Sequence, residues 1–119
     1  MHIETSDNKE ATAKVVLTGH LDVAGADIVA LRLAALAGAK QGLIIDMSAV
    51  SFIAPNGIRH LAAAAEALSR RNGGLVLLDP GPLVAEMLKA SGLTDLLPVV
   101  RSESEALSVL SRTRPSVAV

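Results

Sequence analysis

The central segment of the chain reads Leu43-Ile44-Ile45-Asp46-Met47-Ser48-Ala49-Val50-Ser51-Phe52-Ile53-Ala54-Pro55-Asn56-Gly57, and an alanine-rich run to Arg71 follows it. Leu43 to Ile45 is apolar and mostly β-branched, which is typical of a strand buried on both faces of a sheet. Apolar residues then recur at helical spacing and predict a helix with one buried side: Ile58, Leu61, Ala62, Ala65 and Leu68. We expect Asn56 to be the N-cap of that helix, because its side-chain oxygen can accept a free backbone N–H of the first turn. The functional site is expected at the loop between this strand and this helix.

Strands and helices alternate along the rest of the chain. The sequence predicts strands near residues 2–5, 13–18, 43–47, 75–78 and 97–100, and helices over residues 24–39, 57–71, 82–91 and from residue 103. Ile28, Leu31 and Ala35 fall on one side of the first helix, and Leu107 and Leu110 are expected to face inward on the last. The alternation predicts a single α/β domain over residues 1–112, with a mostly parallel or mixed sheet of four to five strands and about four helices, followed by a flexible tail at residues 113–119.

The composition excludes several classes of function. Phe52 is the only Phe, Tyr or Trp among 119 residues, so we expect no stacking platform for single-stranded nucleic acid, and a formal charge of −1 provides no basic field for a phosphate backbone. The absence of cysteine excludes disulfides and thiolate chemistry and fits a reducing compartment. No apolar run approaches the roughly 20 residues that span a bilayer, and the N-terminus lacks signal-peptide features. We therefore expect a cytoplasmic domain with no nucleic-acid partner and no membrane insertion.

Three landmarks of the chain resemble the STAS domain, the family named for sulfate transporters and anti-sigma factor antagonists. Gly19-His20-Leu21-Asp22 is similar to the family's Gly-x-Leu-Asp turn after the second strand. Asp46-Met47-Ser48, Phe52-Ile53 and Ala54-Pro55-Asn56-Gly57 occupy the places of its Asp-Leu-Ser strand end, its apolar pair and its Asp-Ser-Ser-Gly helix start. Ser91-Gly92-Leu93 is similar to the Ser-Gly-Leu that ends its third helix. Because the landmarks stand in register over almost the whole chain, the resemblance implies a STAS-like fold and a bacterial regulator of transcription.

The helix-start motif departs from the family at one decisive position. In the bacterial antagonists, the second serine of Asp-Ser-Ser-Gly is phosphorylated by an anti-sigma kinase, and the unmodified form binds that kinase and frees the sigma factor. The corresponding residue here is Asn56, which has no hydroxyl, while Ala54 and Pro55 replace the family's Asp and first Ser. A phosphoserine would add about −1.5 to −2 charges at the helix N-terminus. Asn56 has the polarity of the unmodified serine without that charge, so the resemblance implies a non-phosphorylatable variant held in the binding state.

Helical periodicity and the resemblance together define the expected partner contacts. Ala63 and Ala67 fall on the outer side of the helix and form a smooth strip, flanked by charges that can set the register of a partner. The residues expected to contact the partner are Asp22, Ala54, Pro55, Asn56, Gly57, Arg59, His60, Ala63 and Arg70. A purely structural reading stays open, because Asn is an ordinary N-cap, alanine is the best helix former, and Glu66 with Arg70 is a common i,i+4 pair.

An enzymatic function is not expected. Asp22, Asp46 and Asp79 lie near the carboxyl ends of predicted strands, where α/β active sites gather and where carboxylates can hold magnesium. However, the sequence has no phosphate-binding glycine loop, and its histidines are too widely separated to argue for a Ser–His–acid site. A single carboxylate such as Asp46 does not make a site. We therefore expect neither a cofactor nor a bound metal.

The sequence as a whole predicts a protein-binding regulator that resembles an anti-sigma factor antagonist, with an anti-sigma factor of the serine-kinase type as its partner. The alternative is a STAS domain that binds a nucleotide or another small ligand, or regulates a transporter, through the same loop and Asp46. Ser48, Ser51 and Ser91 are candidate modification sites, although Ser48 and Ser51 lie in a stretch that we expect to be mostly packed. A homodimer is also left open.

Overall fold

A computed structural model of the chain describes residues 2–7 and 11–113. These residues form one sheet with the strand order β1-β2-β3-β4-β5, in which β1 is antiparallel to β2 and the other neighbours are parallel. The strands are β1 (His2–Asp7), β2 (Thr12–Leu21), β3 (Gly42–Ile53), β4 (Gly74–Leu78) and β5 (Val99–Val100). The helices are α1 (Val23–Ala39), α2 (Pro55–Arg70), α3 (Pro82–Ala90) and α4 (Glu103–Thr113). The predicted mixed sheet with four helices is confirmed; of the predicted tail, residues 114–119 lie outside the described residues.

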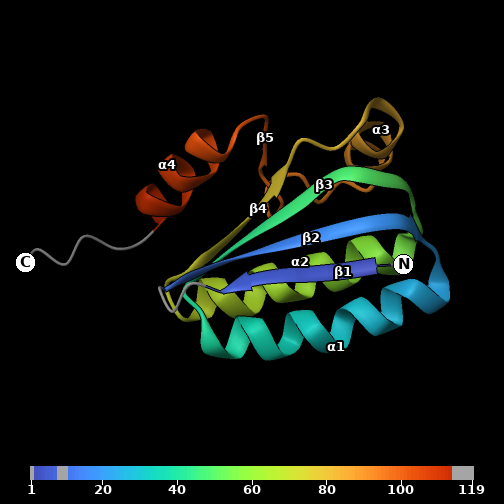
Figure 1. Cartoon of the computed structure of the whole chain (residues 1–119). Helices are drawn as coiled ribbons and strands as arrows, with labels where there is room; N and C mark the ends of the chain where they lie inside the picture. Colours follow the sequence, from blue (N-terminus) through green and yellow to red (C-terminus); the bar gives the residue numbers. More distant parts are fainter. Residues whose placement is uncertain (1, 8–10, 114–119) are drawn as a thin grey trace, which may run out of the picture.

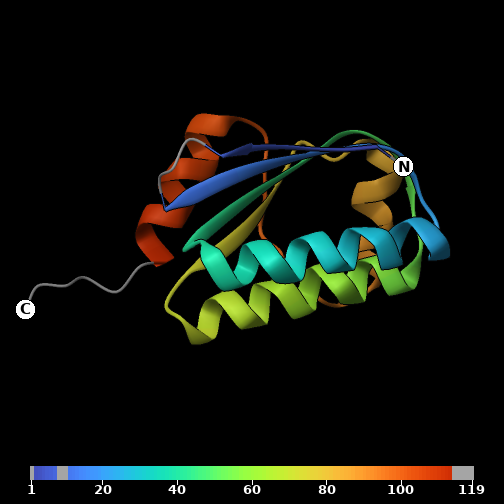
Figure 2. The ribbon, with the colours of Figure 1, turned by 60° about the horizontal axis from the view of Figure 1, so that its bottom comes forward.

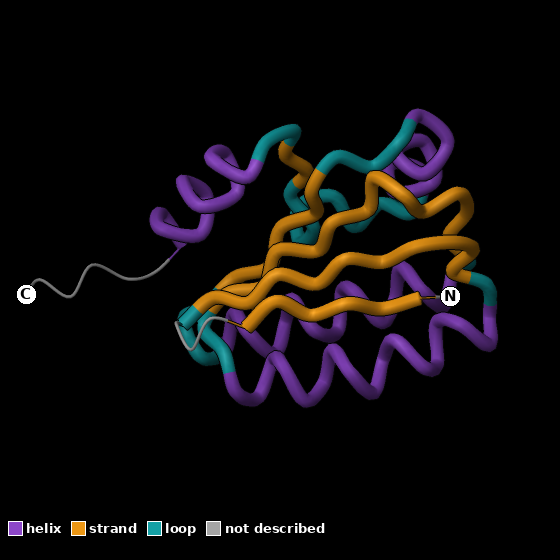
Figure 3. The backbone as a smooth tube through the Cα atoms, in the orientation of Figure 1, coloured by secondary structure: helices purple, strands orange, loops and turns teal. Residues whose placement is uncertain are grey.

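The helices are divided unequally between the two faces of the sheet. α1 and α2 lie side by side beneath one face (Figures 1 and 2), and buried residues of α1, α2 and α3 belong to one large hydrophobic cluster. α4 packs over the opposite face, where Ala106 and Leu110 join a smaller cluster with Ile44, Val76 and Leu78. The tube in Figure 3 shows the loops gathered at the two ends of the strands, which is where a layered α/β domain places its variable surfaces.

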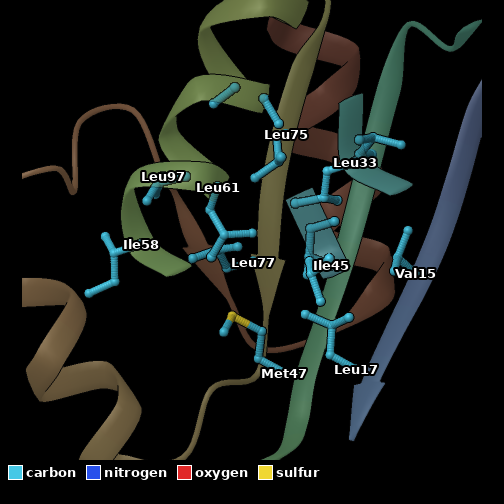
Figure 4. Packing of buried hydrophobic residues seen from close by; sticks show 14 of the residues in the cluster. Val15, Leu17, Leu33, Ile45, Met47, Ile58, Leu61, Leu75, Leu77 and Leu97 are labelled. Carbon is cyan, nitrogen blue, oxygen red and sulfur yellow. The ribbon is translucent and has the colours of Figure 1, made fainter. Parts of the chain in front are cut away.

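The packing of the core explains the continuous apolar run at the start of β3. Along β3, Leu43, Ile45 and Met47 point into the large cluster, while Ile44 points into the small one. Burial on both faces therefore produces the continuous apolar run that the sequence shows. Leu61 of α2 is fully buried and reaches toward the sheet beside Leu77, as Figure 4 shows.

The two longest strands extend beyond their predicted ends. β2 continues through Gly19 to Leu21, and β3 continues to Ile53, because parallel pairing between the two strands resumes after two register shifts. The prediction that Ser48 and Ser51 are mostly packed is wrong: both are exposed on β3, and the Ser51 hydroxyl lies 2.6 Å from Nδ1 of His20. β-Bulges of this kind leave the extra residue outside the regular ladder.

The sides of two helices also differ from the sequence pattern. Ile28 and Leu31 of α1 do share a side, but it is the solvent side, where they are 61% and 78% exposed. The buried side of α1 is made mostly of smaller residues and includes one leucine: Gly25, Ala26, Val29, Leu33 and Ala37. On α4, Leu110 is buried as predicted, whereas the inward prediction for Leu107 is wrong, because Ala106 takes the core position and leaves Leu107 half exposed.

Candidate functional site

The predicted loop lies where two strands end and two helices begin. β2 and β3 are parallel, so their carboxyl ends meet at one edge of the sheet, and the backbone N–H of Ala54 donates to the carbonyl of Leu21 over 2.8 Å. Asp22 follows Leu21 and caps α1, since its carboxylate accepts the backbone N–H of Gly25 at 2.8 Å. The structure therefore places Asp22 beside the loop from Ala54 to Gly57, as the sequence predicted.

Asn56 has a different structural role from the one predicted. The N-cap of α2 is Ala54, which makes no side-chain cap, and Pro55 fills the first turn, where its missing N–H costs nothing. The prediction of Asn56 as N-cap is therefore wrong. Its side-chain Nδ2 donates instead to the backbone carbonyl of Val23 over 3.2 Å, so it joins the first turns of α1 and α2. Its Oδ1 is buried and has no hydrogen-bond partner within the described residues.

Gly57 is tightly packed beneath the loop. A Cβ atom at this position would lie 3.1 Å from Cγ1 of Ile53 and 3.2 Å from the side chain of Leu21. Gly57 is buried, and its hydrogen faces these core residues. It thus holds α2 close to the strand ends, whereas the sequence placed it among the residues expected to contact the partner.

Some of the predicted helix residues lie on the outer side of α2, and others lie where α2 contacts α1. Arg59, Ala63 and Arg70 are exposed on the outer side of α2. His60 is only partly exposed, and its Nε2 lies 3.2 Å from the Asp27 carboxylate of α1. Ala67 packs against the core and, with His60 and Ala63, lines a shallow groove of about 380 Å³ between α1 and α2. The outer surface of α2 is therefore narrower than the sequence indicated, with Ala63 at its margin.

A second groove, which the sequence did not predict, lies on the other flank of α2. It has a volume of about 550 Å³ and is lined by Ile53, Pro55, Ile58, Arg59, Met87, Ala90, Ser91 and Leu93. Its walls come from α2 and from α3 with the turn that follows it, and no local pattern pairs these distant segments. The Ser91-Gly92-Leu93 landmark was the one available signal, because Gly92 adopts a positive φ of 76° that ends α3 at the groove.

The three aspartates considered for catalysis do not converge. Asp46 lies within β3, because the strand continues to Ile53, and its carboxylate accepts from the N–H and hydroxyl of Ser48 at 3.0 and 2.7 Å. Asp79 lies 3.2 Å from the guanidinium of Arg101. Within residues 2–7 and 11–113, no group of three or more His, Cys, Asp or Glu side chains could hold a metal ion.

One ion pair joins the sheet to α4, away from the loop. The Nζ of Lys14 lies 2.8 Å from the Glu103 carboxylate and 3.9 Å from that of Asp46. The hydrogen bond to Glu103 raises the pKa of Lys14 above its ordinary value, and the charge of Asp46 adds to the effect. This network anchors α4 and gives Asp46 a structural role.

The fold and the loop at the sheet edge define a family. The chain belongs to the STAS domain family, whose model matches residues 3–106. Over 112 residues it is 26% identical to a Bordetella bronchiseptica protein described as the anti-sigma factor antagonist BtrV, which covers 93% of this chain and 97% of the relative. A crystal structure of an anti-sigma factor antagonist from Mycobacterium paratuberculosis superposes with a TM-score of 0.80 at 25% identity, covering 92% of this chain and 93% of that one.

A shorter part of the chain is similar to sulfate transporters. High affinity sulfate transporter 2 of Stylosanthes hamata is 40% identical over 57 residues, which are 48% of this chain and 9% of the transporter. The chain thus spans a small part of that protein's length. Among the described residues, no helix is both long and apolar enough to cross a bilayer.

Proposed function

We propose that this protein is an anti-sigma factor antagonist that binds an anti-sigma factor of the serine-kinase type through the loop Ala54–Gly57 and the start of α2. The general role is supported by the STAS family match and by the similarity to BtrV over nearly the full length of both chains. We place this interaction in the bacterial cytoplasm, where sigma factors act, and assign the binding to the domain of residues 1–112, without the tail at 113–119.

Asn56 carries the proposal. It stands at the start of α2, where the family has its phosphorylated serine, and its Nδ2 is held by the carbonyl of Val23. The amide is neutral and its position is fixed, so the loop has a single charge state. A phosphate at this position would add about −1.5 to −2 charges beside the partner. The protein therefore acts as a permanently unphosphorylated antagonist, and the kinase cannot release itself from it by phosphorylation.

The outer surface of α2 extends the contact beyond the loop. Arg59 and Arg70 are exposed and lie on either side of Ala63, whose small side chain lets a partner's backbone approach. Asp22 and Pro55 are exposed at the loop itself. Three further residues hold this surface in position. The backbone N–H of Ala54 donates to the carbonyl of Leu21, Gly57 packs on Ile53, and His60 contacts Asp27 of α1.

A charge at position 56 tests the proposal. Asn56→Asp is nearly isosteric and supplies negative charge at the place of the family's phosphate. We expect the parent to bind a serine-kinase anti-sigma factor equally well with and without ATP, and Asn56→Asp to bind at least about tenfold more weakly by isothermal titration calorimetry, a change of about 1.4 kcal/mol.

Asn56→Ser is the matched control. It is neutral, so it should bind like the parent in the absence of ATP, and its melting temperature should show whether the Val23 contact matters for the fold. Equal affinities of parent and Asn56→Asp, with both folded, would contradict the proposed site. Phosphate incorporation at Ser48, Ser51 or Ser91 that releases the kinase would place the switch elsewhere.

The second candidate function is binding of a small ligand in the groove between α2 and α3. One observation favours it: the groove of about 550 Å³ has apolar walls from Ile58 and Met87 and a single cationic side chain, Arg59. A volume of this size suits a small molecule with one anionic group. Titration with nucleotides should then give saturable binding that Arg59→Gln weakens, whereas the antagonist function requires no such ligand.

A further inference from the structure

The outer side of α1 carries an uncharged apolar seam that the proposed function does not use. Its residues are spaced alternately by four and three positions and all are exposed: Ala24, Ile28, Leu31, Ala35 and Gly38. The seam lies opposite the buried side of the helix, so it protrudes from the molecule. Ile28 and Leu31 are 61% and 78% exposed, although the core of α1 is built largely from smaller residues. Two neighbouring large side chains, Ile28 and Leu31, form the centre of this row, and such a pair suits contact with another apolar surface.

The spacing matches that of a pair of helices. Alternating steps of four and three are the a and d positions of a two-stranded helical coil, in which each residue fits between four residues of the facing helix. In this register Ile28 is an a residue and Leu31 a d residue. A β-branched residue at a with leucine at d favours a coiled coil of two parallel helices. The seam is therefore suited to a second helix with the same seam.

The charges beside the seam agree with that orientation. Asp27 takes position g and Arg32, five residues later, takes position e. In a parallel pair of α1 helices, the g residue of one copy faces the e residue of the other, so Asp27 meets Arg32 of the second copy on both flanks. An antiparallel pair would place g against g and e against e, which brings no opposite charges together. The present contacts, Asp27 with His60 at 3.2 Å and Arg32 with the Thr5 hydroxyl at 3.4 Å, leave both groups with further hydrogen-bonding capacity.

We propose that the protein forms a parallel homodimer in which the α1 helices of two copies pair along the seam of Ala24, Ile28, Leu31, Ala35 and Gly38. This surface is separate from the loop at Asn56, so the inference does not rest on the proposed function. Both copies present their loops at the same end of the dimer, because the loop lies beside the start of α1.

The area of the seam sets the expected affinity of the dimer. A helix of 17 residues is about 25 Å long and about 10 Å wide, which gives about 250 Å² per copy, whereas a stable interface buries about 800 Å² per partner. The dimer should therefore be weak and depend on concentration. Sedimentation equilibrium over a hundredfold range of protein concentration should show a monomer–dimer equilibrium for the parent.

Leu31→Glu should abolish the dimer and leave the fold intact, because Leu31 is 78% exposed. The matched control is Leu83→Glu on α3, which changes a leucine that is 59% exposed outside the seam and should leave the dimer unchanged. The single reversals Asp27→Arg and Arg32→Asp should each weaken the dimer several-fold, and the double reversal should restore it. A parent that remains a monomer throughout, or a dimer that survives Leu31→Glu, would overturn the proposal.

Crosslinking decides the orientation, since the chain has no cysteine of its own. In the parallel dimer each seam residue meets its own copy, so Ala24→Cys and Ala35→Cys should each form a disulfide-linked dimer alone under mild oxidation. An antiparallel pair would bring residue 24 to residue 35 of the other copy. A crosslink that forms only when the two variants are mixed would therefore overturn the parallel arrangement.

Discussion

α1 and α2 lie next to each other on the same face of the sheet, and both are rich in alanine, yet their outer sides have opposite character. The outer side of α1 carries Ile28 and Leu31 without a charged residue between them, whereas that of α2 carries Arg59, Glu66 and Arg70 around Ala63. Where the two helices meet, both use small residues, such as Ala34 and Ala37 on α1 and Ala64 and Ala67 on α2.

This difference separates what the fold requires from what recognition requires. Small residues at the α1–α2 contact and apolar residues toward the sheet are demanded by packing, and the two helices share both features. The outer positions are free of that demand. An apolar seam suits a self-complementary contact, while mixed charge suits a partner that must be selected among others. We therefore infer that the two helices serve two different contacts.

The largest expected effect comes from the inner side of α2. Leu61 is fully buried beneath the sheet, so Leu61→Glu would place a charge in the core without a partner. We expect the domain to unfold, with a loss of more than about 4 kcal/mol. Circular dichroism and urea denaturation measure this directly. A cooperative unfolding transition close to that of the parent would mean that α2 is not anchored as described.

The outer sides of the two helices can be changed one at a time. Ala63→Glu on α2 should alter stability by no more than about 0.5 kcal/mol, because Ala63 is exposed. In a complex the same carboxylate would be buried unpaired, which costs about 3 kcal/mol or about a hundredfold in affinity for the anti-sigma factor. Titration calorimetry measures the affinity, and sedimentation should show that the dimer is retained.

Leu31→Glu on α1 should give the converse pattern, with the dimer lost and the anti-sigma factor still bound. If each variant lost both interactions, the two outer sides would form one surface and the distinction between the helices would fail. If Ala63→Glu lost neither, the loop at Asn56 would have to account for partner binding alone.

The sequence predicted the order of elements well, because strand and helix periodicities in this chain are set locally. The apolar run from Leu43 reflects the burial of one strand, and the helical spacing of Ile58, Leu61 and Leu68 reflects the burial of one side of one helix. The position of Asp22 near the loop at Ala54 was also predictable, since parallel strands bring their carboxyl ends to one edge of the sheet.

What the sequence did not predict depends on contacts between distant segments. Asn56 looked like an N-cap, but the carbonyl of Val23 takes its amide, and that carbonyl is near only because α1 and α2 start side by side. Ile28 and Leu31 had the hydrophobicity of core residues, but α1 turns its smaller residues, Ala26 and Val29, to the sheet. The groove beside Met87 needs α3 to be placed against α2 before it exists.

The smallest expected effect is a loss of stability on the opposite face of the sheet, at the contact between Lys14 and α4. A change there should affect neither of the interactions assigned to α1 and α2. Lys14→Gln removes the ion pair that holds Glu103 of α4 at 2.8 Å. Because both side chains are partly exposed, we expect a loss of only about 0.5 kcal/mol at neutral pH, measured by urea unfolding. Anti-sigma factor binding and dimerisation should be unchanged.

The pH dependence of that loss follows from the pKa of Lys14, which the Glu103 carboxylate raises in the folded protein. A raised pKa means that the folded state binds the proton more tightly than the unfolded state. The stabilisation is therefore fully present below the ordinary pKa of lysine and disappears as the pH rises through the folded-state value. Parent and Lys14→Gln should then converge in stability in strongly alkaline buffer. A difference that persisted there would show that Lys14 stabilises α4 through the packing of its methylene chain on the sheet and not through its charge.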